Sequence, residues 1–292
     1  MPNSFSVAIT PSNEARGLRE GTWRLPLIGR DSRCIALSAV ARPVSELFTY
    51  ARQHPDKRFV LDEMSTATHS ITAKHYADFF RQRPANVSVP TSQDESHPPL
   101  AHSHRLVVAG SRDYDRKDTL FERLDHLTQN LPRQELLLIK GGASGADALG
   151  SEWAEDRSIA RASFPAFWKD LDSPRAIVKT GRYGAYNARA GMDRNARMAA
   201  CATLLAAFPS RPDISSGTKD MIAQATALGL AYRVVMPTTS ESFATDNTYG
   251  EHFEIQKHCP YPAVDCVRHC QRGHAGRKGH PCHRWRHDRG AE

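Results

Sequence analysis

Short apolar runs alternate with helical patterns between residues 105 and 237, and this alternation constrains the fold more than any other feature. Five runs have the length and apolar composition of buried strands, namely RLVVAG, ELLLIK, ARASF, TLLAAFP and AYRVVMP. Helical patterns lie between them, with a long loop expected over 169–192 and Gly229 expected to end the last helix. Strands that alternate with helices predict an α/β domain built on a doubly wound parallel sheet.

Small residues follow three of these strands, at the edge where ligands bind in such sheets. Short turns with free backbone N–H groups at a helix N-terminus can hold a phosphate. Two arginines, Arg112 and Arg194, could add charge-assisted hydrogen bonds to the same anion. The candidate turn residues are Gly110, Ser111 and Arg112, then Gly141, Gly142, Gly145 and Asp147, then Ser215, Ser216, Gly217 and Thr218.

Glycine in one such turn is equally well explained by tight strand–helix packing. Three turns at one edge favour a ligand site over packing alone. The spacing GGxxG differs from the GxGxxG of dinucleotide-dependent dehydrogenases, and no acidic residue stands out as a ribose ligand. The GxxxxGK[ST] pattern of P-loop NTPases is also absent from the sequence.

Six motifs in this region resemble the YspA (cpYpsA-related) branch of the SLOG superfamily. In order they are VAGSRDYD, KGGASGADALGSEWAE, FPAFWKDL, AGMDRNARMAA, LLAAFPS and SSGTKDMIAQATALG. The resemblance covers residues 105–237, a little under half of the chain. It implies a Rossmann-like domain that binds nucleotides or nucleotide-derived ligands. Relatives include cytokinin-activating phosphoribohydrolases and sensors of nucleotide signals in phage–bacterium conflict systems.

The resemblance also assigns roles to individual residues. Contact with the nucleotide is implied for the first turn, and close backbone approach for the glycines of the second turn. Asp147 would fix that loop or bind a ribose hydroxyl. The hydrolase branch has an arginine at the position of Arg194, which Asn195 follows, and a phosphate-binding GT pair at the positions of Gly217 and Thr218.

One position departs from the hydrolase pattern. A glutamate three residues after the threonine is expected, but Met221 stands there. The nearest carboxylate, Asp220, is one residue earlier and is therefore turned by about 100° around a helix. This departure favours binding over hydrolysis. An enzyme that cleaves the N-glycosidic bond of a nucleoside monophosphate with Arg194 and Asp220 remains the alternative.

Aromatic residues near these turns allow a base-stacking role or a packing role. The helical spacing of Trp153 favours the core, whereas Trp168 and Phe167 stand at the start of the long loop. Tyr183 and Tyr186, flanked by glycines, could form a closing loop or an exposed structural one.

The rest of the chain divides into four parts. We expect a flexible arm over 1–33, a small α/β region over 34–90 and a linker over 91–104, before the nucleotide-binding domain over 105–237. In the small region, 34–41 is expected as a strand, and a helix is expected to open at Pro43. Strand, helix and strand are then expected over 58–64, 72–83 and 86–90. Residues 238–292 form a basic tail rich in Cys and His.

The tail offers zinc ligands and positive charge. Cys266, Cys270 and His274 are spaced by four, so on a helix they would share a face, and Cys259 or Cys282 could complete a tetrahedral site. No CxxC knuckle is present, and a solvated extension with incidental cysteines is the plainer interpretation. A structural zinc is thus one expectation for the tail, and no other cofactor is required.

The charge distribution bears on partners. The net charge is +7, but residues 257–292 hold eight Lys and Arg against three Asp and Glu, so the body is nearly neutral. Nucleic-acid binding is therefore suggested only weakly, through the tail. No run is long enough to span a membrane and the first twenty residues lack a secretory pattern, so we expect a cytoplasmic protein. The expected partners are a nucleotide-derived small molecule and, by the resemblance, a second copy in a homodimer.

Overall fold

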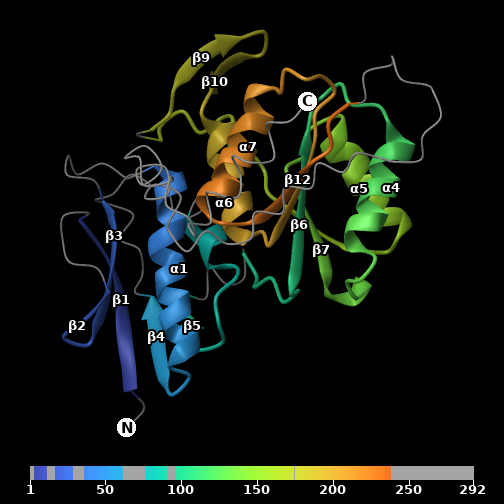
Figure 1. Cartoon of the computed structure of the whole chain (residues 1–292). Helices are drawn as coiled ribbons and strands as arrows, with labels where there is room; N and C mark the ends of the chain where they lie inside the picture. The colour runs from blue at the N-terminus through green and yellow to red at the C-terminus, as the bar shows by residue number, and fades with distance from the viewer. Residues whose placement is uncertain are drawn as a thin grey trace, which may run out of the picture.

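The computed structural model describes residues 3–11, 17–28, 36–61, 76–90, 97–173 and 175–237 (Figure 1). These ranges form two five-stranded sheets and one two-stranded ribbon. The N-terminal sheet lies at the left of Figure 1, beside α1, and the second sheet lies at the right, between two pairs of helices. In the described ranges, no helix combines the length and hydropathy needed to cross a membrane.

The second sheet confirms the predicted doubly wound architecture. Its strand order is β12-β11-β6-β7-β8, and every neighbouring pair is parallel. The strands are β6 (His104–Gly110), β7 (Leu136–Lys140), β8 (Ala160–Ser163), β11 (Leu204–Phe208) and β12 (Ala231–Val234). The chain builds outward from β6 in one direction and then crosses to β11 on the other side. The order therefore reverses between β6 and β11.

Helices cover both faces of this sheet, as the alternation of side chains along β6 requires. Leu106 and Val108 pack in one core with Trp153 of α5, while Val107 packs in the other with Met198 and Met221. Figure 1 shows α4 and α5 on one side of the sheet and α6 and α7 on the other. The helices are α4 (Lys117–Thr128), α5 (Ala146–Asp156), α6 (Ala190–Cys201) and α7 (Ser216–Ala227).

The segment expected as a long loop contains a ribbon instead. Strands β9 (Val178–Gly181) and β10 (Gly184–Asn187) pair antiparallel around a two-residue turn, with Gly184 at a φ of 90°. The Asn187 side chain anchors its base, since Oδ1 accepts hydrogen bonds from the backbone N–H groups of Ile177 and Arg189. The sequence does not predict this ribbon, because all four residues of β9 are exposed and show no apolar alternation.

The N-terminal sheet corrects the expected flexible arm. Three strands lie within residues 1–33, and they form the sheet together with two later strands in the order β2-β3-β1-β4-β5. Val7, Trp23 and Leu25 are buried in its core, so these residues contribute the apolar face that an arm would lack. The strands are β1 (Asn3–Pro11), β2 (Gly17–Arg19), β3 (Thr22–Ile28), β4 (Lys57–Leu61) and β5 (Val87–Ser88).

A helix replaces the strand expected over 34–41. Helix α1 (Leu37–Gln53) runs through this segment, and Pro43 lies inside the helix rather than at its start. Val40, Val44 and Leu47 are buried at helical spacing against the sheet. The later strands over 57–61 and 87–88 occur where expected, whereas 72–83 is described only from residue 76 and contains the short 3₁₀ helix η1 (Asp78–Phe80).

Helix α6 joins the two sheets. Its Ala196 and Ala200 belong to the core of the N-terminal sheet, while Met198, Ala199 and Cys201 belong to the core beside β6. Arg197, fully buried between them, donates from Nη1 to Asp78 Oδ2 at 2.6 Å and from Nη2 to the Pro165 carbonyl at 2.6 Å.

Candidate functional site

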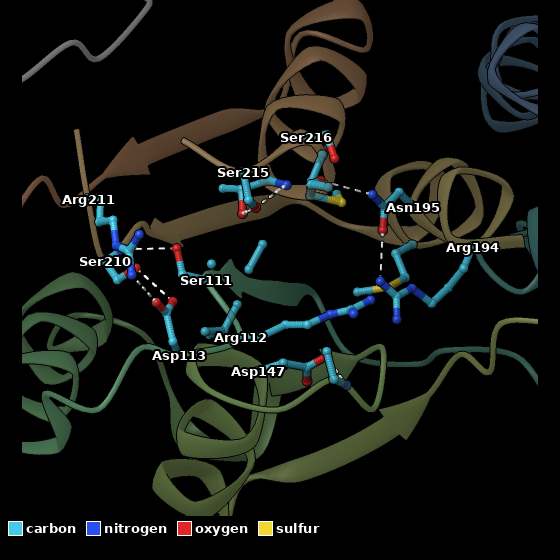
Figure 2. A pocket seen from close by; sticks show the side chains of 18 of the residues that line it. Ser111, Arg112, Asp113, Asp147, Arg194, Asn195, Ser210, Arg211, Ser215 and Ser216 are labelled. Carbon is cyan, nitrogen blue, oxygen red and sulfur yellow. Dashed lines mark hydrogen bonds and ion pairs between the residues drawn. The ribbon is translucent and has the colours of Figure 1, made fainter. Parts of the chain in front are cut away.

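A cavity of about 540 Å³ opens at the point where the strand order reverses. Its walls come from the residues that follow β6 and β11 and from α6 and α7 (Figure 2). This is the edge at which open parallel sheets bind ligands. The lining residues are Val108, Ala109, Gly110, Ser111, Arg112, Asp113, Ala143, Asp147, Arg194, Asn195, Met198, Ser210, Arg211, Asp213, Ser215, Ser216, Gly217, Thr218 and Met221.

The turn after β6 is tied directly to the turn after β11. The Ser111 N–H donates to the Phe208 carbonyl at 3.1 Å, and Ser111 Oγ accepts from the Ser210 N–H at 2.9 Å. Gly110 permits this approach, because a Cβ there would lie 2.2 Å from the Phe208 oxygen. The two turns that flank the cavity are therefore held together before any ligand binds.

The glycine-rich turn after β7 needs glycine at position 145. Its φ is 68°, and a Cβ would lie 2.2 Å from the Ser111 carbonyl oxygen. The buried Asp147 holds the same turn, because Oδ2 accepts from the N–H groups of Gly141 and Ala143, each at 3.0 Å. Of the two roles open to Asp147 in the sequence, this contact fits the fixing of the loop.

Burial raises the pKa of Asp147, while its hydrogen bond from Ala143, the nearby Arg194 guanidinium and the hydrogen bond from Gly141 act in the opposite direction. Burial also lowers the pKa of Arg194, although Asp147 counteracts the shift. The guanidinium stays charged at neutral pH, since arginine is effectively always protonated. The floor of the cavity thus contains a cation and a carboxyl group whose ionisation is made less favourable by burial.

Helix α6 supplies two linked side chains. Arg194 donates from Nη1 to the Gly141 carbonyl at 3.0 Å and from Nη2 to Asn195 Oδ1 at 3.2 Å. Its Nε is buried and has no hydrogen-bond partner in the described ranges. Asn195 in turn donates from Nδ2 to the Gly217 carbonyl at 3.2 Å and to Asp220 Oδ2 at 2.8 Å. This chain of contacts connects the glycine-rich turn to α7.

The N-terminus of α7 faces the cavity from the opposite side. Ser215 caps the helix, with Oγ accepting from the Thr218 N–H at 3.4 Å. Ser216 and Gly217 lie in the first turn, where an α-helix offers their N–H groups no internal acceptor. The helix therefore presents donors and the positive end of its dipole to the cavity.

The charges at the cavity fall into two groups. On the rim, Asp113 is paired with Arg211 at 3.3 Å, and the hydrogen bond from Ser210 lowers the pKa of this carboxyl. The exposed Arg112 and the partly buried Arg194 extend toward each other (Figure 2). Neither arginine forms an ion pair with a carboxylate in the part of the chain that the structure describes. Their mutual repulsion would be relieved by an anion bound between them.

The structure brings most of the predicted residues together. All of the following line the cavity: Gly110, Ser111, Arg112, Asp147, Arg194, Asn195, Ser215, Ser216, Gly217 and Thr218. Gly141, Gly142 and Gly145 do not line it, and shape the adjacent turn instead. The sequence reasoning missed Asp113, Ser210, Arg211 and Asp213, although the motifs VAGSRDYD and LLAAFPS contain or precede them.

The candidate catalytic carboxylate lies outside the cavity wall. Asp220 accepts hydrogen bonds from Asn195 Nδ2 at 2.8 Å and from Gln224 Nε2 at 3.4 Å. Met221, fully buried, occupies the wall in its place. As expected from the rotation of about 100° per residue in a helix, Met221 lines the cavity and Asp220 does not.

The candidate zinc ligands Cys259, Cys266, Cys270 and His274 lie outside the described residues. Within those residues, no group of three or more His, Cys, Asp or Glu side chains is arranged to hold a metal ion. Zinc in the tail stays a prediction.

Comparisons with known proteins agree with the motifs. Residues 104–170 match the family described as YspA, cpYpsA-related SLOG family, which confirms the resemblance for that segment. Among curated proteins, none matches the chain. One similar solved structure is DNA processing protein A (DprA) from Streptococcus pneumoniae, at 15% sequence identity and a TM-score of 0.34. The similarity covers 47% of this chain and 52% of that one, so the chain matches about half the length of that protein.

Proposed function

We propose that the chain binds a nucleotide or nucleotide-derived ligand by its phosphate, in the cavity between β6 and β11, and holds it without cleaving it. The observation that carries this proposal is the convergence of Arg112, Arg194 and the first turn of α7 on one cavity. Each supplies N–H donors, and together they supply the positive potential that an anion requires. The family resemblance supports a nucleotide as the source of that anion.

The geometry favours a preformed site. Hydrogen bonds from Ser210 to Ser111 and from Arg194 to Gly141 hold the surrounding turns in place. A preformed site avoids the entropy cost of ordering loops on binding, so more of the interaction energy contributes to affinity. Such a site suits a sensor or a sequestering protein that must retain its ligand.

Hydrolysis is the weaker candidate because each carboxylate at the cavity is already engaged. Asp113 is paired with Arg211, and Asp213 with Lys219. A phosphoribohydrolase must stabilise positive charge on the ribose as the base departs, which requires an anionic group in the cavity. Asp220 is engaged with Asn195 and Gln224, and Asp147 with two backbone amides. Met221 at the wall offers no charge. Binding through the tail lies outside the described residues and has no structural support.

Calorimetric titration of the full chain tests the proposal, using nucleoside monophosphates, ADP-ribose and cyclic nucleotides. At least one of them should bind, and Arg112→Ala should weaken it about 10-fold or more, because charge-assisted hydrogen bonds contribute about 1.5–3 kcal/mol. Arg133→Ala is the matched control, since Arg133 is also exposed but lies just before β7, at the opposite end of the sheet. Binding by none of the ligands, or equal loss in both variants, would refute the proposal.

Chromatography of the small molecules after incubation separates binding from catalysis. A ligand recovered intact after denaturation of the protein is the expected result. Free base that accumulates with time would instead show a phosphoribohydrolase, and Asp220→Asn would then identify whether this carboxylate takes part.

A further inference from the structure

The Trp168 side chain, which belongs to the segment after β8, packs against the N-terminal end of helix α6 at Gly191. Its indole reaches Gly191 closely enough that a Cβ on this glycine would lie 3.3 Å from the ring. Gly191, Arg194, Asn195 and Met198 are spaced by three, four and seven residues, so they share one face of α6. The last three line the cavity, and Gly191, which Trp168 contacts, lies about one helical turn, roughly 5 Å, along the helix from Arg194.

Trp168 is held in place without being buried. The backbone carbonyl of Trp168 accepts a hydrogen bond from the Asn187 N–H at 2.8 Å, which ties this residue to the base of the ribbon. Tyr186 of β10 packs against the indole edge to face, with ring centroids 6.4 Å apart. The adjacent Lys169 Nζ donates to the carbonyls of Tyr183 and Ala185 across the ribbon. Even so, Trp168 keeps 40% of its surface exposed.

The other aromatic residues that the sequence offers for base stacking are either packed against other side chains or exposed at the tip of the ribbon. Trp153 is fully buried and donates from Nε1 to Asp125. The Arg197 guanidinium stacks on Phe167 at 4.4 Å. Tyr183 is 84% exposed at the tip of the ribbon, with the Arg182 guanidinium beside its ring. Trp168 is thus the exposed aromatic residue that contacts α6 at Gly191, and Tyr186 packs against it.

We propose that Trp168, supported by Tyr186, is a stacking platform for the base of a nucleotide whose phosphate lies beside Arg194. This inference rests on the proposed function and narrows it, because a platform selects ligands that carry a planar group over bare phosphates and sugar phosphates. A ribose would span the helical turn between the two contacts. Stacking tolerates any base, so the platform gives affinity for the base without fixing its identity.

Paired titrations of the full chain test the platform, with each of the four common nucleoside 5′-monophosphates compared with ribose 5-phosphate. The best-bound nucleotide should bind about 10-fold or more tightly than ribose 5-phosphate, the scale of one base–aromatic stack. Trp168→Ala should remove that ratio and leave ribose 5-phosphate affinity unchanged, and Trp168→Phe should keep most of it. Tyr183→Ala removes an exposed aromatic side chain from the neighbouring β9–β10 ribbon; it is the matched control and should change neither affinity.

Each outcome decides one of the two proposals. Equal affinities for nucleotide and sugar phosphate in the wild type would overturn the platform and leave phosphate binding intact. Equal weakening of both ligands by Trp168→Ala would also overturn it, since that pattern shows a structural role. Binding of neither ligand class by the wild type, with ADP-ribose and cyclic nucleotides equally inert, would overturn the proposed function and the platform with it.

Discussion

At residue 145 the backbone adopts a positive φ in close contact with the carbonyl of Ser111. We expect Gly145→Ala to lower the free energy of unfolding by about 2 kcal/mol or more, because a Cβ adds both strain and a clash with backbone. Gly217→Ala is the control, since a Cβ there meets open space in a helical first turn. Urea denaturation of both variants checks this, and equal stabilities would show that the turn adapts.

The carboxyl group of Asp147 should make stability depend on pH. A pKa raised by burial means that the folded chain holds this proton more tightly than the unfolded chain does. Its contribution to stability is therefore greatest below the unfolded pKa, about 3.9, and is lost as pH rises through the raised value. The Asp147→Asn variant lacks this titration and serves as the reference.

The measurement is the free energy of unfolding of wild type and Asp147→Asn between pH 4 and pH 7. The wild type should lose stability relative to the variant as pH rises. A difference that is constant across this interval, or that changes in the opposite direction, would contradict the assignment of burial as the dominant cause.

At the scale of elements, the capped N-terminus of α7 connects stability with anion binding. Ser215→Ala removes the acceptor for the Thr218 N–H and should lower the free energy of unfolding by about 1 kcal/mol. Because the helix start forms one wall of the cavity, nucleotide affinity should fall as well. Thr226→Ala, near the other end of α7, is the matched hydroxyl deletion. It should leave affinity unchanged, and equal effects of the two on affinity would argue against the anion site.

The sequence predicts the five parallel strands and four α-helices of 104–237 well because they alternate as short apolar runs and helical patterns, whereas the exposed β9–β10 ribbon gives no such signal. The N-terminal region was harder to interpret. Residues 36–41 are small and apolar, a composition that fits a buried strand as well as a helix, and Pro43 normally indicates a helix start. The strands within 3–28 gain their stability from α1 and β4, which a local pattern cannot reveal.

The site was predicted in part for a related reason. Glycines, a helix cap and arginines near strand and helix ends are local signals, and they identified ten of the lining residues. Ser210 and Asp113 join the site through a hydrogen bond between turns that are 97 residues apart. That contact depends on β6 and β11 being neighbours, and strand order is not a property of any short segment.

At the scale of the whole molecule, the buried pair of Arg197 and Asp78 holds the two sheets together. Both side chains are almost completely removed from solvent, and the Arg197 guanidinium also donates to the Pro165 carbonyl. Asp78→Asn should lower the free energy of unfolding by about 3 kcal/mol or more, because it leaves a buried charge without its partner.

An exposed ion pair provides the contrast for this prediction. Arg42→Ala, which removes the pair between Arg42 and Glu46 on the surface of α1, should cost less than about 1 kcal/mol. Chemical denaturation of both variants measures the two effects. Comparable losses would indicate that the Arg197–Asp78 contact contributes no more than a surface pair.

Helix α6 presents Arg194 and Asn195 to the cavity. It presents Ala196 and Ala200 to the core of the N-terminal sheet, and Arg197 to Asp78 of η1. Over evolutionary time, this double use ties the two halves of the chain to each other. A recombination event that exchanged the first hundred residues for an unrelated domain would expose Ala196 and Ala200 to solvent and would leave Arg197 without its partner Asp78. It could be retained only with compensating substitutions on the helix that also lines the cavity. The N-terminal sheet and the parallel-sheet domain should therefore be inherited as a pair, and changes in η1 should be matched by changes in α6.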